Sequence, residues 1–387
     1  MTTSITTPSP QAAAAAPSDG ERQTPVAGVL DVDGGRGFLR VGGYVPGPHD
    51  VTVPPERIRR YGLRKGDAVE GAAAGSGRGR ALARVDRVGG LPAEAARGRR
   101  HFADLTPLHP SERLRLESPK GGLATRVLDL LAPVGKGQRG LIVAPPKTGK
   151  TMLLRAVADA VADNHPECHL MVVLLDERPE EVTEMRRSVR GEVIASTFDR
   201  TPRQHIAVAE LAVERARRLV EAGRDVVVLL DSVTRLCRAH NNAASSGGRT
   251  LSGGVDAAAL TGPKRLFGAA RAAEEGGSLT ILATALVETG SRADDYFFEE
   301  LKGTGNMELR LDRALADRRV FPAVDVHPSG TRREELLLSP AELAASHGLR
   351  RALRGGTGSF ETLLARLRET PDNAAFLRQI RGTVPAA

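Results

Sequence analysis

The chain has 387 residues, of which 41% are hydrophobic and 26% charged, and its formal net charge is +8. This length suffices for two domains with separate cores, and the positive charge favours a polyanionic partner such as nucleic acid. Aromatic residues make up only 3% of the chain and tryptophan is absent, so any stacking on bases depends on a few side chains.

The N-terminal composition, the apolar runs and the cysteines argue against a secreted or membrane protein. No apolar run approaches the ~20 residues of a membrane span. The chain has no Lys or Arg before Arg22, which argues against a signal peptide. Cys168 and Cys237 are isolated and show no metal or redox spacing, as is typical of a reducing compartment. We therefore expect a cytoplasmic protein.

The first part of the chain predicts a tail and a small barrel. Residues 1–25 are rich in Thr, Ser, Pro and Ala, and we expect a disordered tail there. Residues 26–90 contain short β-like runs between Gly and Pro turns, which favour an OB-fold. The expected strands are Val26–Val32, Gly37–Val41, Asp50–Val53, Asp67–Ala73 and Ala81–Val88.

Residues 26–100 hold fourteen Lys or Arg and eight Asp or Glu. A small basic barrel is typical of proteins that bind single-stranded nucleic acid; a charged barrel with an assembly role is the alternative. Residues 91–120 read as a connector. From 121 to 387 apolar strands alternate with amphipathic helices, which predicts a parallel sheet covered by helices.

The segment from Leu141 to Thr151 is the central motif. A short apolar run ends in a turn that carries Gly149 and Lys150, and an apolar-periodic segment follows. The pattern predicts strand, loop and helix, and it fits a P-loop with Ala144 in place of the usual first glycine. The loop N–H groups and the helix N-terminus would bind phosphate. Lys150 is expected at the β- and γ-phosphates and the Thr151 hydroxyl on Mg²⁺.

Two further apolar runs end in carboxylates. Leu170–Leu175 precedes Glu177, and Val226–Leu230 precedes Asp231. Since ligands bind at the carboxyl ends of parallel strands, we expect both acids near Lys150. Asp231 is then the candidate for holding Mg²⁺ and Glu177 for polarising the attacking water. A helix N-cap or a surface acid is the alternative for either residue.

Two later loops are rich in Gly and Ser and carry one arginine each. They span residues 241–255, with Arg249, and 288–295, with Arg292. Loops of this kind suit a mobile grip on a nucleic-acid backbone, although ordinary surface loops have the same composition.

The C-terminal third offers two more candidates. Arg332 lies in a Gly-containing turn far along the chain from the P-loop, and we interpret it as an arginine finger acting across a subunit boundary. Phe321 precedes Pro322 and is a candidate for stacking on adenine. Apolar-periodic helices from about residue 340 would close the domain or pack against a neighbour.

Seven sequence strings together give the chain a resemblance to one family, the bacterial transcription termination factors of the Rho type. Members of this family are RNA-dependent ATPases and helicases. The resemblance covers about residues 26–380 and accounts for the missing first glycine of the P-loop. The strings span residues 135–151, 176–185, 230–235, 251–256, 268–280, 302–309 and 319–325.

The resemblance implies a RecA-like P-loop ATPase core preceded by an OB-fold, cold-shock-like barrel. It also implies a homohexameric ring with ATP between subunits, translocation 5′ to 3′ along single-stranded RNA, and action on RNA polymerase. The implied catalytic residues are Lys150, Glu177, Asp231, Arg332 and Arg319. The implied ATP contacts are Gly135, Lys136, Gly137, Gln138, Arg139, Gly140, Lys147, Thr148, Gly149, Lys150, Thr151, Met152, Arg178 and Phe321, with Thr151 and Asp231 on Mg²⁺. The implied RNA contacts are Arg249, Leu251, Ser252, Gly253, Gly254 and Arg292 in the channel, and Phe38, Arg40, Arg36 and Arg80 on the barrel.

The barrel departs from the family pattern. The usual helical segment before it is replaced by the short tail. Arg36 stands where an aromatic residue is usual, and Thr52 and the Gly79–Arg80 turn stand where aromatics line the base pocket; Arg292 replaces a lysine. Phosphate contacts from arginine do not read sequence. The barrel is therefore predicted to be a weaker, less cytosine-selective and more salt-sensitive RNA site.

Three classes of function remain open at this point. The first is an ATP-driven RNA translocase that terminates transcription. The second is a rotary or strand-exchange motor on the same core fold, against which the basic barrel and the arginine loops argue. The third is a non-motor paralogue that binds RNA, which ATP turnover distinguishes from the first.

Overall fold

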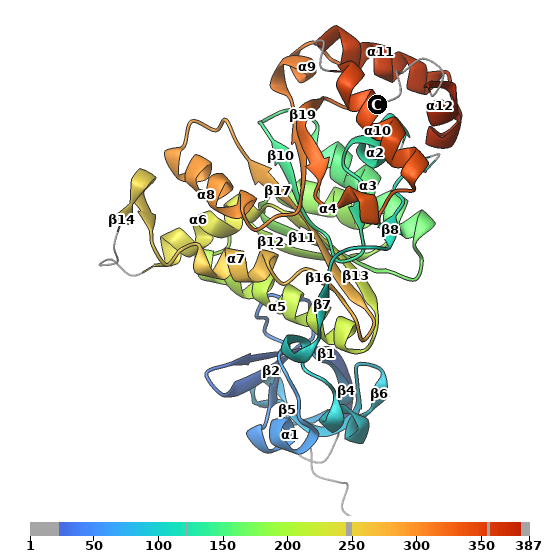
Figure 1. Ribbon diagram of the computed structural model, residues 1–387. Helices are drawn as coiled ribbons and strands as arrows, with labels where there is room; N and C mark the ends of the chain where they lie inside the picture. The colour runs from blue at the N-terminus through green and yellow to red at the C-terminus, as the bar shows by residue number, and fades with distance from the viewer. Residues whose placement is uncertain (1–22, 119, 121, 245–249, 354–356, 381–387) are drawn as a thin grey trace, which may run out of the picture.

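The computed structural model describes residues 23–118, 120, 122–244, 250–353 and 357–380. Figure 1 shows a small barrel, in blue, and a larger α/β body that contains the rest of the chain. Among the described residues, no helix is long and apolar enough to cross a membrane. The expected tail, residues 1–25, lies almost entirely outside the described part of the chain.

The barrel has the five predicted strands. They are β1 (Thr24–Asp33), β2 (Arg36–Arg40), β3 (Val51–Val53), β4 (Ala68–Ala74) and β5 (Ala81–Val88). The order is β3-β2-β1-β4-β5, and a parallel pairing of Thr52 with Ala81 closes the sheet on itself. Alternate side chains such as Leu39, Val51 and Val53 fill the interior. Helix α1 (Pro55–Tyr61) follows β3, and β6 (Leu91–Pro92) pairs with β5.

The segment predicted as a connector is divided between the two bodies. The 3-10 helix η2 (Ala93–Gly98) contributes Ala93 and Ala96 to the barrel core, and η3 (Phe102–Asp104) follows it. Strand β7 (Pro107–Leu108) pairs with β16 (Arg271–Ala273), and β8 (Arg113–Leu114) pairs with β9 (Val134–Gly135). Strands of two residues leave no periodic signal in the sequence, and therefore only the structure reveals them.

The α/β body is built on a nine-stranded sheet whose main path is β12-β11-β13-β17-β10-β18-β19. Neighbours from β12 to β18 are parallel, and β19 is antiparallel to β18. The strands are β10 (Arg139–Ala144), β11 (His169–Glu177), β12 (Glu192–Thr197), β13 (Asp225–Asp231), β17 (Ser278–Leu286), β18 (Met307–Leu311) and β19 (Val324–Thr331). We call the edge where β10, β11 and β13 end the carboxyl edge, and the edge where they begin the amino edge.

Helices cover both faces of this sheet, with a separate hydrophobic core on each side. One face packs against α2 (Gly122–Leu131), α3 (Lys150–Asn164) and α4 (Pro179–Ser188). The other packs against α5 (Pro202–Glu221), α6 (Val233–Ala243), α7 (Thr261–Phe267) and α8 (Arg292–Lys302). After α9 (Arg313–Asp317) and η5 (Glu334–Leu336), helices α10 (Pro340–Ala352), α11 (Thr357–Arg368) and α12 (Asn373–Ile380) join the α2 side, as Figure 1 shows. The C-terminal helices thus close their own domain.

The barrel lies against α5 through polar contacts. The side chain of Glu221, the last residue of α5, is almost fully buried. Its Oε2 is 3.0 Å from Arg64 Nη2, and its Oε1 accepts a hydrogen bond of 2.7 Å from Phe102 N. Tyr44, in the loop between β2 and β3, donates its hydroxyl to Glu192 Oε1 on β12 at 2.5 Å. The two bodies are therefore joined by specific hydrogen bonds and ion pairs.

Candidate nucleotide and RNA sites

The P-loop connects β10 to α3 at the carboxyl edge. Gly149 is the N-cap of α3 and has φ 90°, and Lys147 has φ 66°. The Thr148 hydroxyl donates to the Pro145 carbonyl at 2.7 Å and holds the turn closed. Left-handed residues in such a turn direct successive N–H groups to one side, next to the positive end of the helix dipole. The turn is therefore shaped to bind phosphate.

Lys150 and Asp231 meet at this edge. The Lys150 Nζ lies 2.5 Å from Asp231 Oδ1 and 2.6 Å from Oδ2. Asp231 ends β13, is 2% exposed, and accepts a second hydrogen bond from the Thr284 hydroxyl of β17 at 2.8 Å. Thr151, the second residue of α3, is half-buried beside Lys150. The structure thus brings together the residues predicted for the γ-phosphate and for Mg²⁺.

Glu177 lies at the end of β11, the strand next to β13. It is 4% exposed, and its Oε2 accepts a hydrogen bond from Arg235 Nη1 at 2.8 Å, while its Oε1 accepts one from the Arg178 backbone N–H at 3.2 Å. Burial, followed by the negative charge of Glu177, raises the pKa of the nearby Glu181. The Arg178 side chain is exposed at the start of α4.

Arg235 and Thr284 were not among the predicted site residues. Arg235 is in the first turn of α6, and it also donates to the carbonyls of Leu175 and Asp176 at 3.1 and 2.6 Å. Its contact with Glu177 joins segments 58 residues apart, so no local pattern in the sequence signalled it. Thr284 had no local signal either, because it reaches Asp231 only through the pairing of neighbouring strands.

A cavity of about 750 Å³ opens beside the P-loop. Phe321, 42% exposed, and Met152, 70% exposed, are apolar side chains on its wall, and Lys147, Thr148 and Gly149 line the same cavity. A Cβ on Gly149 would lie 3.6 Å from the Phe321 ring. The predicted adenine residue is therefore next to the phosphate loop of its own chain.

Six residues predicted to bind ATP lie elsewhere. Gly135, Lys136, Gly137, Gln138, Arg139 and Gly140 precede or begin β10, and so they lie at the amino edge, about 17 Å from the P-loop at ~3.3 Å of rise per strand residue. The Lys136 Nζ is bound by carboxylates of Glu112, Glu167 and Asp225 at 2.6, 3.3 and 2.8 Å. The structure therefore does not bring these six residues to the P-loop of their own chain, and their assignment as ATP contacts stays a prediction.

The arginines predicted to act on the γ-phosphate lie in two places. Arg332 follows β19 directly and is exposed at the amino edge, where Thr331 pairs with Met307, and Met307 pairs with Gly140. Arg332 is therefore too far from the P-loop of its own chain to reach a phosphate bound there. Arg319 is exposed in the turn after α9, two residues before Phe321, and so lies close to its own cavity.

The two arginine loops predicted for the RNA channel come together, although Arg249 lies outside the described residues. Strand β14 (Thr250–Leu251), η4 (Ser252–Gly254) and β15 (Val255–Asp256) form the first loop. Gly253 has φ 77°, and a Cβ there would lie 3.0 Å from the Arg292 carbonyl carbon. Arg292, the first residue of α8, is exposed.

Helix α6 joins this loop region to the carboxyl edge. Its Arg238 donates from Nε to Asp294 Oδ1 of α8 at 2.9 Å, and Asn241 Nδ2 donates to the Gly254 carbonyl at 3.3 Å. Arg235, which contacts Glu177, is on the same helix. One rigid element therefore touches Glu177 and both loops.

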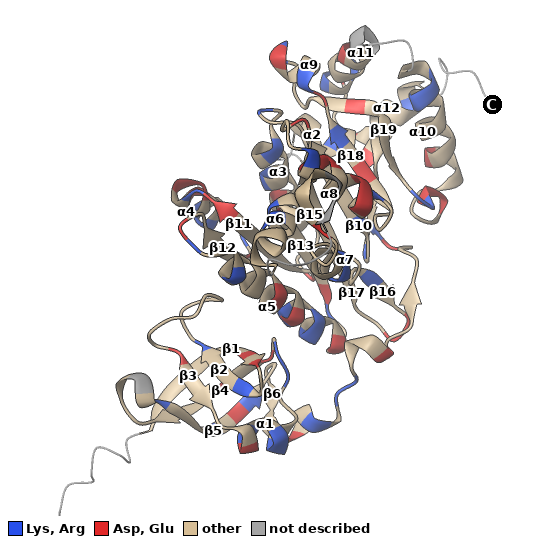
Figure 2. Ribbon diagram, turned by 90° about the vertical axis from the view of Figure 1, so that its left-hand side faces the viewer, with Lys and Arg blue, Asp and Glu red and all other residues tan. Residues whose placement is uncertain are grey.

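On the barrel, the predicted RNA residues differ in availability. The Arg40 side chain is 10% exposed and pairs with Asp31 at 2.5 Å and Asp50 at 2.7 Å, while its guanidinium lies 5.3 Å from the Phe38 ring centroid. Arg36 is exposed at the start of β2, and Arg80 Nη2 donates to the Thr24 hydroxyl at 3.0 Å. Figure 2 shows both signs of charge on the barrel strands. Of these three arginines, Arg36 is the one whose guanidinium is most available to bind RNA.

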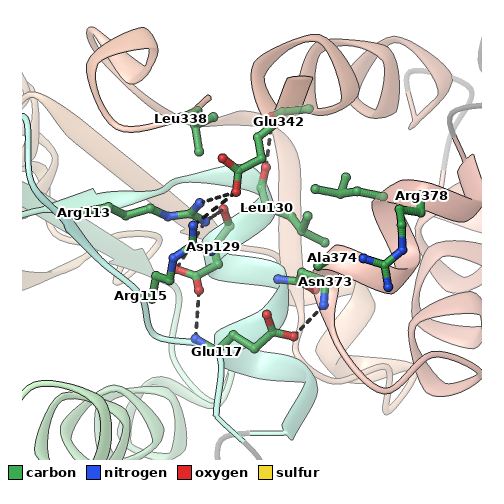
Figure 3. Close-up of a pocket in the computed structure, with 12 residues that line it drawn as sticks. Arg113, Arg115, Glu117, Asp129, Leu130, Leu338, Glu342, Asn373, Ala374 and Arg378 are labelled. Carbon is green, nitrogen blue, oxygen red and sulfur yellow. Dashed lines mark hydrogen bonds and ion pairs between the residues drawn. The ribbon is translucent and has the colours of Figure 1, made fainter. Parts of the chain in front are cut away.

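A second cavity, of about 320 Å³, lies between β8, α2, α10 and α12 (Figure 3). Asp129 Oδ2 accepts hydrogen bonds from the N–H groups of Leu116 and Glu117 at 3.0 and 2.8 Å. Arg113 donates to Glu342 Oε1 at 3.1 Å and to the Asp129 carbonyl at 3.0 Å. The charges around this cavity fasten the segment before α2 to the C-terminal helices.

Comparison with known proteins identifies the family. The chain is 72% identical over 363 residues to a transcription termination factor Rho of Streptomyces coelicolor, covering 93% of this chain and 86% of that protein. The chain belongs to the Rho family of transcription termination factors. A Rho of Streptosporangium roseum is 63% identical and is covered to 92%, whereas one of Mycobacterium tuberculosis is 59% identical and is covered to 62%. The resemblance seen in the sequence is confirmed.

Family models and solved structures agree with the two bodies of this Rho chain. The Rho termination factor RNA-binding domain matches residues 26–94, and the ATP synthase alpha/beta family nucleotide-binding domain matches residues 124–331. An ATPase of a type III secretion system shares the fold, with TM-score 0.56 and 24% identity over 64% of this chain and 70% of its own. The assembled ATPase EscN of enteropathogenic E. coli gives 0.55 and 24%, covering 64% and 58%. The predicted OB-fold barrel and RecA-like core are confirmed.

Proposed function

We propose that this chain binds nascent RNA and uses RNA-dependent ATP hydrolysis to move 5′ to 3′ along it, releasing the transcript from RNA polymerase. The observation that carries the proposal is the meeting of Lys150, Glu177 and Asp231 at one sheet edge, in a chain that also has an RNA-binding domain. Such a factor acts in the cytoplasm, where transcription takes place.

The residues of the carboxyl edge divide the work of hydrolysis. Glu177 accepts the proton of the attacking water, and Arg235 holds its carboxylate in place. Lys150 neutralises charge on the transferred phosphoryl group, while Phe321 stacks on the base in the adjoining cavity. Thr151 and Asp231 would hold Mg²⁺ through oxygen ligands of the kind that this ion prefers, and the ion would supply further neutralisation of phosphate charge.

Arg332 supports a ring of identical subunits. Because it lies at the edge opposite its own P-loop, its guanidinium can stabilise a γ-phosphate only on a neighbouring subunit. Arg319, beside the cavity, is the second arginine of this interface. A homohexamer with ATP between subunits satisfies both positions.

RNA acts through two sites. In the central channel, Arg292 and the loop of residues 249–254 hold the backbone, and α6 carries the effect of hydrolysis to them through Arg238 and Asp294. On the barrel, Phe38 and Arg36 contact RNA with few aromatic partners. The loss of stacking, worth about 1–3 kcal/mol per base, leaves this primary site weak and salt-sensitive.

ATP turnover of the purified protein tests the proposal, measured without RNA, with poly-C and with RNA of mixed sequence. We expect RNA to stimulate turnover, and both RNAs to do so to a similar degree. Absence of turnover in a folded hexamer contradicts the motor and favours a non-motor RNA-binding paralogue. For the barrel, oligo-C and oligo-A are titrated at several salt concentrations; a strong, salt-tolerant preference for oligo-C would contradict a weakened primary site.

A further inference from the structure

The surroundings of Arg332 suggest a role for the glycine-rich segment Gly135–Gly140, which does not reach the P-loop of its own chain. Arg332 lines a cavity of about 270 Å³ at the amino edge together with Asn306 and Glu308. Burial, followed by the positive charge of the nearby Arg332, lowers the pKa of Arg139.

Asn306 is the centre of the hydrogen bonds at this place. Its backbone carbonyl accepts the Arg332 N–H at 2.8 Å, and its own N–H donates to the Arg139 carbonyl at 2.9 Å. Its side-chain Oδ1 accepts from Gln138 Nε2 at 2.7 Å and from the Arg139 N–H at 2.9 Å. The residue that precedes Arg332 is held as well, because the Thr331 hydroxyl donates to the Pro133 carbonyl at 2.7 Å.

Gln138 is fixed in turn by its own loop. It is fully buried, and its Oε1 accepts the Gly135 N–H at 3.1 Å. Gly137 has φ 94°, and a Cβ there would lie 2.2 Å from the Ala272 nitrogen. No side chain fits at Gly137 without displacing the backbone of β16, and in this tightly packed turn Gln138 donates its amide to Asn306.

We propose that Asn306 and Gln138 are positioning residues for Arg332, so that the Gly135–Gly140 segment builds the platform of an arginine finger instead of a phosphate site. This inference rests on the proposed function, because it assigns a role to the neighbours of that finger. Its basis is the continuous set of hydrogen bonds from Gly135 through Gln138 and Asn306 to the Arg332 backbone. A finger is useful only if it meets the transferred phosphoryl group correctly, and a displacement of 1 Å can cost about 100-fold in rate.

The test is Asn306→Ala in the full ring, with saturating RNA. We expect kcat to fall about 10- to 100-fold, with the KM for ATP within about twofold, because the P-loop of the same subunit is untouched. Affinity for ADP with aluminium fluoride, a mimic of the transferred phosphoryl group, falls in parallel, and affinity for ADP alone does not. Asn306→Asp keeps the Oδ1 acceptor, and we expect it to retain most of the kcat and most of the affinity for ADP with aluminium fluoride.

Ser278→Ala is the matched control. Ser278 is buried at the same edge and donates to Asp225 Oδ1 at 2.7 Å, away from Arg332, so kcat and fluoride binding stay unchanged. Gln138→Glu removes the donor to Asn306 and serves as the second variant should Asn306→Ala fail to fold; it too lowers kcat and fluoride affinity.

An unchanged kcat in either folded variant overturns the inference, as does an equal loss of ADP and ADP–fluoride affinity. Arg332→Ala separates this inference from the proposed function. Full turnover in Arg332→Ala would contradict the role of Arg332 as an arginine finger, and with it the proposed function of this residue. If Arg332→Ala is inactive and Asn306→Ala is fully active, only the positioning role of Asn306 and Gln138 is contradicted.

Discussion

Two glycine- and lysine-rich segments, residues 135–140 and 145–151, lie at opposite ends of β10, and their chemistry differs completely. At the carboxyl edge, Gly149 lies at a helix N-terminus, where an added Cβ would be in ordinary contact with the Phe321 ring at 3.6 Å, and Lys150 faces Asp231. At the amino edge, Gly137 presses on the backbone of β16, and Lys136 is enclosed by three carboxylates. Composition alone therefore does not make a phosphate site; the end of the strand at which the segment lies decides it.

The largest expected difference between the two edges comes from replacing Lys150 and Lys136 in turn. Lys150→Ala removes the charge at the phosphates, and we expect kcat to fall by about 100-fold or more. Lys136→Ala leaves kcat within about twofold, but it strips the cation from three carboxylates and lowers the free energy of unfolding by about 2 kcal/mol. Steady-state ATPase assays and urea denaturation measure the two. A Lys136→Ala protein that is stable but inactive would contradict the division between the edges.

The two glycines form the next pair. Gly137→Ala places a Cβ 2.2 Å from the Ala272 nitrogen at a φ of 94°, and we expect it to cost about 3 kcal/mol of stability. Gly149→Ala, with the Phe321 ring at 3.6 Å as its nearest neighbour, costs about 1 kcal/mol but lowers kcat/KM for ATP. Thermal melts and initial rates distinguish them, and equal melting temperatures for the two variants would count against the packing role of Gly137.

Phe321→Ala sharpens the account of the carboxyl edge. It removes the aromatic wall of the 750 Å³ cavity, and we expect KM for ATP to rise about tenfold, since stacking on a base is worth about 1–3 kcal/mol. Leu108→Ala, an exposed apolar residue on β7 near the amino edge, serves as the control and leaves KM unchanged. If KM does not move in Phe321→Ala, the base binds elsewhere.

The smallest effect concerns His205, beside the carboxyl edge. Burial lowers the pKa of His205. The negative charges of Asp176 and Asp199 partly oppose this shift, and the positive charge of Arg235 adds to it. The His205 ring also forms a hydrogen bond of 2.7 Å with the Ser196 hydroxyl. The unfolded chain therefore takes up the proton first. The stability from the neutral ring is fully present above the unfolded pKa of about 6.5 and is lost as pH falls through the folded pKa. The urea midpoint should fall less between pH 8 and pH 5.5 in His205→Gln than in the native protein. An identical fall in both proteins would exclude His205 as a source of the pH-dependent stability.

The sequence by itself determined the features that depend on neighbouring residues. The P-loop, the acids that end β11 and β13, and the five barrel strands all follow from apolar periodicity and turn residues within a few positions of one another. The seven strings between residues 135 and 325 together were sufficient to recognise the family.

Only the tertiary structure decided which of these features face each other. Gln138 and Asn306 are 168 residues apart in sequence, and Thr284 and Asp231 are 53 apart. The order of parallel strands brings each pair together, and no local pattern encodes that order. The same order moves Gly135–Gly140 and Arg332 to the amino edge, away from the P-loop. Strand pairing over long separations is thus the physical reason why local patterns in the sequence indicate candidate residues but not the edge of the sheet at which each of them lies.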